Sequence, residues 1–533
     1  MKQVAVIGAG ASGLPAIKAC VEEGMLPTCF EKSGALGGLW NYTREVREDQ
    51  SCVMKSTVIN TSKEMLSYSD FPVPKDYAMY MHHAYVLKYL NLYAKEFDLA
   101  KYIRFRTEVQ SVVMANDYET SGRWDVTIKE LQSGKVTTET YDAVMVCIGQ
   151  HTYKYIPEFA GIEKFKGKIF HSHDYRDCRG YEDQKVIVVG VGNSGVDTAV
   201  DLSRTSKQVY LSTRRGCWVS KRLTDKGAPD DMQSYRRYLI ALRDRIPTGI
   251  LEFGKIRKMN QRFDHKSYSL KPEHGYFSQH PTISDDLPNR IASGSIIVKP
   301  NIKRFLENGA EFEDGTVEEN IDAVFLATGY KYNFPFLDNS LIEVKGNRVD
   351  LYKHLFPPNL KHNTMVLIGI MQQIGAVFPI SELQSRLSAR VFKGDIQLPS
   401  STEMWNDINR KRDVVKKRFV QSNRYTMKVD MVPYMDELAE LHGSKPDLYR
   451  VAMSDPTLAF QCFFGPCTPY QFRLEGPCTW KGAREAIMTQ WDRTWHPMKT
   501  RPTGPYSWIE SMETYLYAIV CLLMAYCLLI VFL

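Results

Sequence analysis

The chain has 533 residues, of which 44% are apolar, and this length allows two to four domains with a sizeable core. Its formal net charge of +7 is mild and spread out, and no dense basic tract with interleaved aromatic residues occurs, so nucleic acid is not expected as a partner. The 11 cysteines include no CxxC pair and no paired Cys/His spacing. We therefore expect no disulfide framework, no dithiol redox centre and no metal site, and a reducing compartment around the catalytic body.

The chain opens on a strand-like run, residues 4–7, followed by a glycine-rich turn. That turn reads Gly8, Ala9, Gly10, Ala11, Ser12 and Gly13. In a GxGxxG turn the glycines allow a tight bend, close approach of backbone to a pyrophosphate, and packing of helix on strand. Glu31 ends the next strand-like stretch, where a carboxylate can accept both hydroxyls of an unphosphorylated ribose. The pattern predicts a Rossmann unit that binds FAD.

The stretch after this unit is loop-rich over residues 36–80 and helical near 85–96. Alternating apolar residues then predict strands at 109–114, 124–129 and 136–141, before a buried strand and turn at 143–149. The adjacent histidines His82 and His83 have no evident partner ligands, so a packing or surface role is expected for them rather than a metal.

A second glycine-rich turn follows the β-branched run at residues 186–189. It reads Gly190, Val191, Gly192, Asn193, Ser194 and Gly195. The strand after it ends without an acid, at Arg214 and Arg215, which can clamp a 2′-phosphate, although two such arginines are also typical of a solvated surface. The pattern predicts NADPH at this site, with the pyrophosphate beside Ser194, Gly195, Val196 and Asp197 and the 2′-phosphate on Arg214.

The remaining chain completes an α/β fold with two Rossmann-type dinucleotide-binding domains. Residues from about 218 to 301 break the alternation of strand and helix and are interpreted as an insertion. The buried strand at 321–330 is expected to return the chain to the first domain, which then includes a helix at 379–392. The predicted segments are 1–155 (FAD domain, first part), 156–324 (NADPH domain with the insertion), 325–440 (FAD domain, second part), 441–510 (membrane-associated) and 511–533 (transmembrane anchor).

The expected anchor follows from composition, because residues 514–533 contain no charge, proline or glycine. In a helix this stretch rises about 30 Å, the thickness of a bilayer core. A buried core helix is the alternative. No secretory signal precedes the first strand, so insertion is expected after synthesis, with residues 1–510 left in the cytosol.

Between the two turns, Phe165, Gly167, His171 and Tyr175 form the pattern FxGxxxHxxxY. This pattern resembles the fingerprint of flavin-containing monooxygenases, whereas related Baeyer–Villiger monooxygenases usually carry Trp at the last position. Further segments, at residues 37–40, 60–65, 286–290, 327–330 and 379–384, are similar to the membrane-anchored vertebrate-type family, in order and over essentially the whole chain. Residues 280–282 look most like the fifth-type branch, a member of which favours ketones.

The resemblance implies an enzyme of the endoplasmic reticulum membrane that uses FAD, NADPH and O₂. NADPH would reduce the flavin, a C4a-(hydro)peroxyflavin would form, and NADP⁺ would shield it. The implied catalytic residue is Asn60, whose amide can hold peroxide, flavin or nicotinamide without supplying a proton; a plain helix or turn cap is its alternative. Gly38, Leu39, Trp40 and Thr61 would join the FAD contacts, although Trp40 also suits a core. His171 and His173 would be linker residues that couple domain position to NADP binding, or purely structural.

The implied substrates are small lipophilic molecules with soft nitrogen or sulfur nucleophiles, such as amines, sulfides and other xenobiotics. Three alternatives stay open at this point. The same intermediate could oxygenate ketones or aldehydes to esters, or the enzyme could be an uncoupled NADPH oxidase that releases H₂O₂. A non-enzymatic membrane scaffold would bind no yellow cofactor. The oligomeric state, monomer or homo-oligomer, stays open as well.

Overall fold

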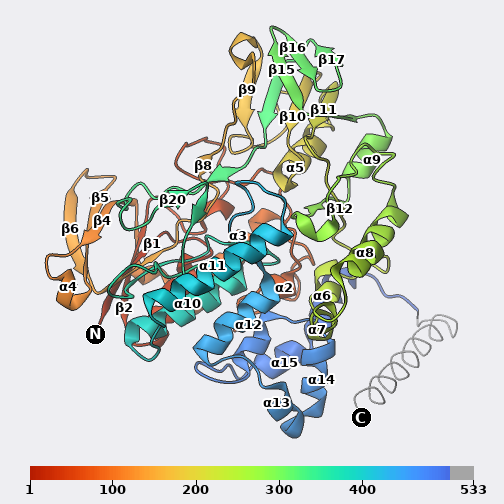
Figure 1. Ribbon diagram of the computed structural model, residues 1–533. Helices are drawn as coiled ribbons and strands as arrows, with labels where there is room; N and C mark the ends of the chain where they lie inside the picture. The colour runs from red at the N-terminus through yellow and green to blue at the C-terminus, as the bar shows by residue number, and fades with distance from the viewer. Residues whose placement is uncertain (505–533) are drawn as a thin grey trace.

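The computed structural model describes residues 1–504. Two parallel five-stranded sheets organise this part of the chain, the second above the first in Figure 1. The first sheet has the order β22 (Met365–Leu367), β7 (Ala143–Val146), β1 (Gln3–Ile7), β2 (Leu26–Glu31) and β3 (Ile103–Phe105). The second has the order β14 (Ile296–Lys299), β11 (Gln208–Ser212), β10 (Lys185–Val189), β18 (Ala323–Leu326) and β9 (Lys168–His171).

Both central strands are apolar at every buried position because both faces of each sheet are covered. In β1, Val4 and Val6 face one core cluster while Ala5 and Ile7 face another. β10 repeats this alternation. The strand pattern therefore explains the two sheets, and the glycine-rich turns lie at the carboxyl ends of their central strands.

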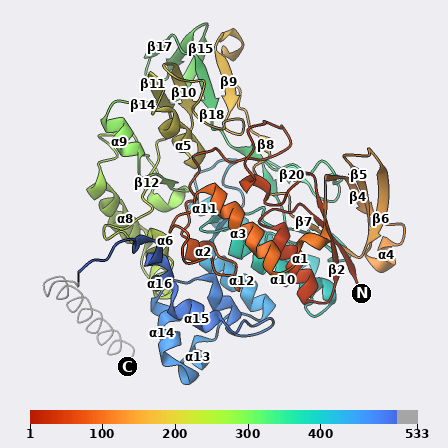
Figure 2. The same ribbon diagram turned by 180° about the vertical axis from the view of Figure 1, so that it is seen from behind.

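Helices α1 (Gly13–Glu22), α10 (Phe378–Lys393) and α12 (Met431–His442) pack side by side in the first unit, as Figure 2 shows for α1 and α10. This unit also contains α2 (Lys63–Leu66), α3 (His83–Glu96) and α11 (Ser401–Arg418). Its antiparallel sheet is β4 (Thr107–Met114), β5 (Trp124–Glu130) and β6 (Val136–Tyr141), with α4 (Tyr118–Ser121) between the first two strands. The helices and strands expected at 85–96, 109–141 and 379–392 are confirmed.

The second unit has α5 (Asn193–Leu202) after its glycine turn and an antiparallel sheet of β15 (Ile302–Leu306), β16 (Gly309–Phe312) and β17 (Val317–Glu319). The insertion contains β12 (Val219–Ser220), α6 (Asp230–Ser234), α7 (Arg237–Arg243), α8 (Thr248–Arg262), β13 (Thr282–Ile283) and α9 (Leu287–Ala292). It is thus mixed helix and loop, as expected, with one short pair of strands, β12 and β13.

The strand expected at 321–330 lies in the second sheet, and its expected role was wrong. β18 pairs with β10 and β9, so the chain does not re-enter the first unit until after Leu326, and the boundary predicted at residue 324 cuts this strand. A buried apolar strand carries no mark of the sheet it joins, because both sheets offer the same environment.

The chain crosses between the sheets at one place. The outgoing strand β8 (Tyr153–Lys154) pairs with the returning strand β19 (Tyr330–Lys331) in an antiparallel ribbon. Tyr155 N–H also donates to Gly329 C=O at 2.9 Å. Two further ribbons, β20 (Val344–Lys345) with β21 (Arg348–Val349) and β23 (Gln372–Ile374) with β24 (Lys428–Asp430), belong to the returning segment.

The C-terminal helices α13 (Leu448–Ser454), α14 (Pro456–Phe464), α15 (Ala483–Met488) and α16 (Gln490–Trp495) lie together in the lower part of Figure 2. Buried ion pairs join this segment to the first unit: Arg473 contacts Glu382 and Asp70, each at 2.8 Å, and Arg493 contacts Glu64 at 2.6 Å. No helix within residues 1–504 is long and apolar enough to cross a membrane. The predicted anchor, 511–533, lies outside the described residues.

Candidate functional site

The first glycine-rich turn has a backbone that only glycine can adopt. Gly8 has φ +99°, and a Cβ there would lie 2.8 Å from Cys147 C=O. A Cβ on Gly13 would lie 1.8 Å from Gly8 C=O, inside the backbone of the turn itself. Because helix α1 begins at Gly13, its first N–H groups border the same bend. The turn therefore fits a pyrophosphate.

Glu31 lies directly beside this turn. Its carboxylate is buried and accepts hydrogen bonds from the N–H groups of Ala9 and Ser33, both at 2.8 Å. Each oxygen keeps a lone pair, so the carboxylate can still accept a ribose hydroxyl. The side chain that sequence reasoning assigned to the ribose thus also supports the backbone of the turn.

The segment Gly37–Trp40 packs against the first turn. Gly37 N–H donates to Ala9 C=O at 3.0 Å, and a Cβ on Gly38 would lie 3.2 Å from Gly10 Cα. Leu39 and Trp40 are half-buried, and the Trp40 ring meets Phe378 edge-on at 6.2 Å. The structure thus brings Gly38, Leu39 and Trp40 to the predicted flavin side of the turn.

The far end of the turn is tied to the helices behind it. Tyr68 O–H donates to Ala11 C=O at 2.7 Å, and the Ser12 and Ser381 hydroxyls are 3.0 Å apart. A Cβ on Gly369 would lie 2.3 Å from the Ser12 hydroxyl, so residue 369 must also be small. These contacts hold Ala11 and Ser12 in place before any nucleotide binds.

The second glycine-rich turn repeats the same geometry. Gly190 has φ +111° and faces Ala327 C=O, and a Cβ on Gly195 would lie 2.0 Å from Gly190 C=O. Ser194 is exposed at the start of α5, whereas the Val196 side chain is fully buried in the core, so only the backbone of Val196 faces outward. Burial raises the pKa of Asp197 to about 7, against the opposing effect of Arg222. A partly protonated carboxyl there repels a nearby phosphate less than an ionised one does.

Strand register shows how the residues that follow the two turns differ. Gly8 N–H bonds Phe30 C=O, and Gly190 N–H bonds Ser212 C=O, so Thr213 occupies the place that Glu31 has in the first unit. Arg214 is the next residue, and both Arg214 and Arg215 are exposed. Replacement of the acid by a hydroxyl with arginines beside it suits a phosphorylated ribose.

Asn60 is held by a residue of the insertion. Arg222 Nη2 donates to Asn60 Oδ1 at 2.7 Å, and Arg222 Nη1 pairs with Asp285 at 3.0 Å. No other residue among 1–504 takes a hydrogen bond from Asn60 Nδ2. The amide is therefore oriented with its acceptor occupied and its donor available.

A second hydrogen bond from the insertion holds the same loop just beyond Asn60. Ser62 N–H donates to Asp231 of α6 at 2.7 Å, and burial raises the pKa of Asp231 to about 6. Thr61 lies half-buried between the two contacts. Two elements of the insertion thus position the Asn60 loop, which does not merely cap a helix: α2 has no side-chain cap from this loop.

A chain of contacts connects this loop to the second glycine turn. Asp285, the partner of Arg222, lies close to Ile283, whose N–H donates to Asn193 Oδ1 at 2.8 Å. The Thr282 hydroxyl donates to Val191 C=O. From the other side, Gly369 touches Ser12 of the first turn while Gln372 N–H donates to Met427 C=O at 2.8 Å. The insertion therefore links the Asn60 loop to the second turn, and residues 369–372 link the first turn to the segment before β24.

The FxGxxxHxxxY residues are structural. Phe165 packs in the core, and a Cβ on Gly167 would lie 2.5 Å from the Phe165 ring. His171 Nδ1 accepts from His173 N–H at 3.0 Å, and burial lowers the pKa of His171 to about 4. Tyr175 O–H donates to Asp201 of α5 at 2.7 Å. These contacts fix the strand and helix that carry the second turn.

His82 and His83 also have structural positions. His82 caps α3 by accepting from Ala84 N–H at 3.3 Å, and the buried His83 ring lies 5.3 Å from Tyr42. Within residues 1–504, no cluster of three or more His, Cys, Asp or Glu side chains is arranged to hold a metal ion.

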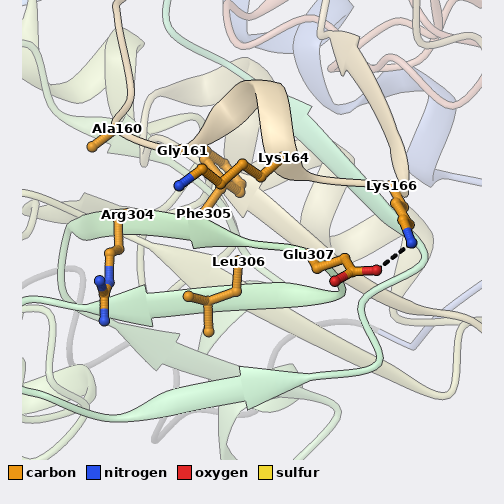
Figure 3. A pocket seen from close by; sticks show the side chains of 8 residues that line it. All are labelled: Ala160, Gly161, Lys164, Lys166, Arg304, Phe305, Leu306 and Glu307. Atoms are coloured by element: carbon orange, nitrogen blue, oxygen red, sulfur yellow. Dashed lines mark hydrogen bonds and ion pairs between the residues drawn. The ribbon is translucent and has the colours of Figure 1, made fainter.

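One surface hollow, of about 550 Å³, lies beside β15 and the 3₁₀ turn Ile162–Lys164 (Figure 3). Its lining residues are Ala160, Gly161, Lys164, Lys166, Arg304, Phe305, Leu306 and Glu307. Lys166 and Glu307 form an ion pair across it. None of the predicted cofactor residues lines this hollow, so it is separate from the dinucleotide sites.

Sequence reasoning missed Arg222 and Asp231. Both belong to the insertion, and the hydrogen bond from Arg222 to Asn60 spans 162 positions. No local pattern marks such partners. The only available signal was that the insertion is rich in charged residues.

Comparison with known proteins agrees with this geometry. The family model for flavin-binding monooxygenase-like proteins matches residues 1–532. The chain is 49% identical to human flavin-containing monooxygenase 5 over 515 residues, 96% of each chain, and 46% identical to human flavin-containing monooxygenase 3 over 94% of each. Among solved structures, S-allyl-L-cysteine S-oxygenase from Allium sativum superposes with a TM-score of 0.65 at 27% identity, covering 93% of this chain and 98% of that one.

Members of this family use FAD and NADPH, and both glycine cradles fit such dinucleotides because a Cβ at Gly13 or Gly195 would enter the turn. The similarity extends along nearly the whole of each relative. With matching turns, a matching fingerprint and matching fold, the chain belongs to the flavin-containing monooxygenases.

Proposed function

We propose that this enzyme uses NADPH and O₂ to oxygenate soft nitrogen or sulfur nucleophiles in small lipophilic molecules. The observation that carries the proposal is the oriented amide of Asn60, held by Arg222 in a chain that also has two dinucleotide cradles. Bound flavin, once reduced, supplies the activation of O₂. The similarity to an S-oxygenase at 27% identity supports sulfur as one acceptor atom.

We assign the cofactor contacts by the same logic. Residues proposed for FAD are Gly8, Ala9, Gly10, Ala11, Ser12, Gly13, Glu31, Gly38, Leu39, Trp40, Asn60 and Thr61. Residues proposed for NADPH are Gly190, Gly192, Ser194, Gly195, Val196, Asp197 and Arg214. Of these, Val196 contributes backbone alone because its side chain is buried.

Asn60 suits the catalytic position because its amide has no acidic proton. With Oδ1 bonded to Arg222, the amide is held in one orientation, and its Nδ2–H groups have no partner among residues 1–504. An amide donor stabilises developing negative charge on oxygen but has no proton to lose near neutral pH. An acid in its place would supply one and favour release of H₂O₂ over transfer of oxygen to the substrate.

The test is to measure NADPH-dependent O₂ uptake by the FAD-loaded enzyme with a thioether, a tertiary amine and a simple ketone in parallel. We expect S-oxide and N-oxide in proportion to the NADPH consumed. Ester formed from the ketone would identify the Baeyer–Villiger alternative. H₂O₂ equal to the NADPH consumed, with no oxygenated product from any substrate, would show an uncoupled oxidase and contradict the proposal. Absence of a flavin spectrum would identify a scaffold.

We further infer that residues 441–510 associate with a membrane of the endoplasmic reticulum and that 511–533 anchor the chain there, with the catalytic units in the cytosol. Large apolar side chains stand exposed on four neighbouring helices, α7, α8, α13 and α14: Leu242, Ile250, Phe253, Tyr449, Met453, Phe460 and Phe464. The Tyr238 and Phe464 rings meet at 5.5 Å, which joins α7 to α14. Exposed apolar surface of this kind suits a lipid interface.

Deletion of residues 511–533 should leave FAD binding intact and reduce membrane retention without abolishing it, because the apolar helices remain. Adding Phe460→Glu and Phe464→Glu to the truncation should release the protein, as measured by sedimentation with microsomes. Val414→Glu is the matched control, since Val414 is 58% exposed on α11 outside this surface. If truncation alone makes the protein fully soluble, the exposed apolar helices do not bind the membrane. If truncation leaves membrane retention unchanged, residues 511–533 are not the anchor.

A further inference from the structure

The second glycine turn is contacted by a cation from the first unit. A Cβ placed on Gly192 would lie 2.8 Å from Nη2 and 2.9 Å from Nη1 of Arg424. Gly192 is the middle glycine of the turn and the N-cap of α5. Arg424 belongs to the loop between α11 and β24, on the segment that returns after the second sheet. Its guanidinium therefore lies on the backbone that a pyrophosphate would approach.

The loop that carries Arg424 is held in position by Asn347. The Asn347 amide donates to Asn423 C=O at 3.0 Å and accepts from Tyr332 N–H at 2.7 Å. The Thr426 hydroxyl donates to Asn347 C=O at 2.5 Å. Asn347 itself has φ +57°, in the tight turn between β20 and β21. Arg424 thus reaches the turn from an anchored backbone next to the crossover ribbon.

The surroundings of Arg424 are cationic and lack an acid to neutralise them. Among residues 1–504, no carboxylate pairs with Arg424 or with Lys428, which is 9% exposed. Burial, and then Arg424, lower the pKa of Lys428 to about 7, and burial, Lys428 and Arg424 lower the pKa of His280. The nearby acid Asp430 is engaged by Arg418 at 2.6 Å. An arginine that has no carboxylate partner and lies on a glycine turn is typical of an anion site.

We propose that Arg424 binds the pyrophosphate of the nicotinamide dinucleotide at the second glycine turn. The proposal rests on the NADPH site inferred above. It assigns the two groups of phosphates in NADPH to two different arginines. Arg214 would read the 2′-phosphate, which NADH lacks, whereas Arg424 would bind the pyrophosphate, which NADPH and NADH share. Because Arg424 is exposed, its side chain is free to lift from Gly192 and pair with the phosphates.

A second consequence is that nucleotide binding links the two units. Arg424 is attached to the first unit and Gly192 to the second, so a shared phosphate bridges them at the crossover ribbon. The bridge would hold the second unit against the Asn60 loop while the nucleotide stays bound.

The test is the dissociation constant of NADP⁺ and of NAD⁺, measured by calorimetry on oxidised, FAD-loaded enzyme. Arg424→Ala should weaken both nucleotides by the same factor, about tenfold or more, because charge-assisted bonds to phosphate are the strong ones. Arg424→Lys should recover part of the loss. Arg214→Ala should weaken NADP⁺ alone. Lys417→Ala, an exposed cation on α11, is the control and should change neither.

Two results would overturn the inference. If Arg424→Ala leaves both dissociation constants unchanged, Arg424 does not bind the nucleotide. If it weakens only NADP⁺, Arg424 reads the 2′-phosphate instead. Failure of the unaltered enzyme to bind either nucleotide would instead contradict the NADPH site itself, and this inference with it. Flavin absorbance and melting temperature of each variant, which we expect unchanged, separate lost binding from lost fold.

Discussion

At the scale of single residues, the two dinucleotide sites differ by one substitution in register. Glu31 and Thr213 occupy equivalent places after their strands, and Arg214 follows Thr213. An acid repels a 2′-phosphate, and an arginine attracts it. The choice between the two nucleotides should therefore reside in residues 213 and 214.

Arg214→Ala should raise KM for NADPH much more than KM for NADH, because a lost Arg–phosphate pair costs roughly 2–4 kcal/mol. Adding Thr213→Glu should shift the preference further toward NADH by restoring the acid of the first site. Steady-state kinetics with both coenzymes measures this. If KM rises equally for NADPH and NADH, Arg214 does not bind the 2′-phosphate.

Arg222→Ala should lower the rate of substrate oxygenation about tenfold and raise the share of NADPH lost to H₂O₂, with FAD retained. The physical reason is that Asn60 Oδ1 loses a charge-assisted hydrogen bond worth about 1.5–3 kcal/mol, so the amide can rotate. Product yield per NADPH is the measurement. Arg245→Ala, an exposed arginine of the same insertion, is the control. Full coupling in Arg222→Ala would show that Asn60 needs no such support.

Residue-scale reasoning from sequence reached the sites whose signals are local. The glycine turns, Glu31 and Arg214 follow from strand, turn and strand in one stretch of chain. Arg222 and Arg424 could not be found this way, because each contacts a residue far along the chain and neither lies in a pattern. The environment of Arg424 is created by packing alone.

At the scale of elements, each glycine turn and its helix form one rigid unit. The third glycine of each turn lies in the first turn of its helix, Gly13 in α1 and Gly195 in α5. A Cβ there would lie 1.8 Å (Gly13) or 2.0 Å (Gly195) from the carbonyl oxygen of the first glycine. A methyl group cannot enter there without moving backbone. The two turns should therefore fail independently of one another.

Gly195→Ala should abolish NADP⁺ binding while FAD remains bound, and Gly13→Ala should yield protein without FAD. Flavin absorbance and NADP⁺ calorimetry on each variant measure the two sites separately. Gly254→Ala is the control, since a Cβ there meets nothing within 4 Å on helix α8, and alanine favours a helix by roughly 1 kcal/mol. Loss of FAD in Gly195→Ala would mean that the turns are not independent.

Elements with strong periodicity were predicted well, whereas one uniformly buried strand, β18, was assigned to the wrong sheet. The strands at 109–141 alternate because one face is solvated, and the helix at 379–392 has clear bounds, Phe378–Lys393 in the structure. β18 is apolar throughout, so its partners were not readable from its residues. The register with β10 decided its sheet.

At the scale of the whole molecule, buried histidines dominate the response to acid. His83, His171, His265, His354 and His442 are all nearly inaccessible. Burial lowers the pKa of each, to about 4 for His83, His171 and His265, about 3 for His354 and about 2 for His442. The unfolded chain takes up these protons near pH 6.5, whereas the folded chain does not. Stability is therefore present above pH 6.5 and lost as the pH falls toward 4.

The free energy of unfolding should fall between pH 7 and pH 5, by about 2 kcal/mol for each such histidine. Burial raises the pKa of Asp197 and Asp231 to about 7 and about 6, which opposes this trend. These two carboxyls are outnumbered by the histidines, because burial lowers the pKa of His151 and His280 as well. His265→Gln should flatten the dependence, because His265 is kept neutral: Nε2 accepts from Val219 N–H at 3.1 Å and Nδ1 lies 2.8 Å from Asn260 Oδ1.

The pH dependence of the free energy of unfolding is measured by urea titration at several pH values, with flavin release as the signal for unfolding. His362→Gln is the control, since His362 lies at the surface beside Glu119. An unchanged slope in His265→Gln would show that the acid response comes from other groups.

The crossover ribbon has a topological meaning for the whole chain. Entry to the second unit at Lys154 and exit at Tyr330 are partners in one ladder, and Tyr155 bonds Gly329 across it. The intervening polypeptide is therefore a closed loop inserted at a single point of its host. The two ends of this module therefore lie side by side, and contacts of the insertion, Arg222 with Asn60 and Arg237 with Asp436, tie it to the host at further points. A homologous module that keeps these contacts could replace it and leave the host strands in continuous register.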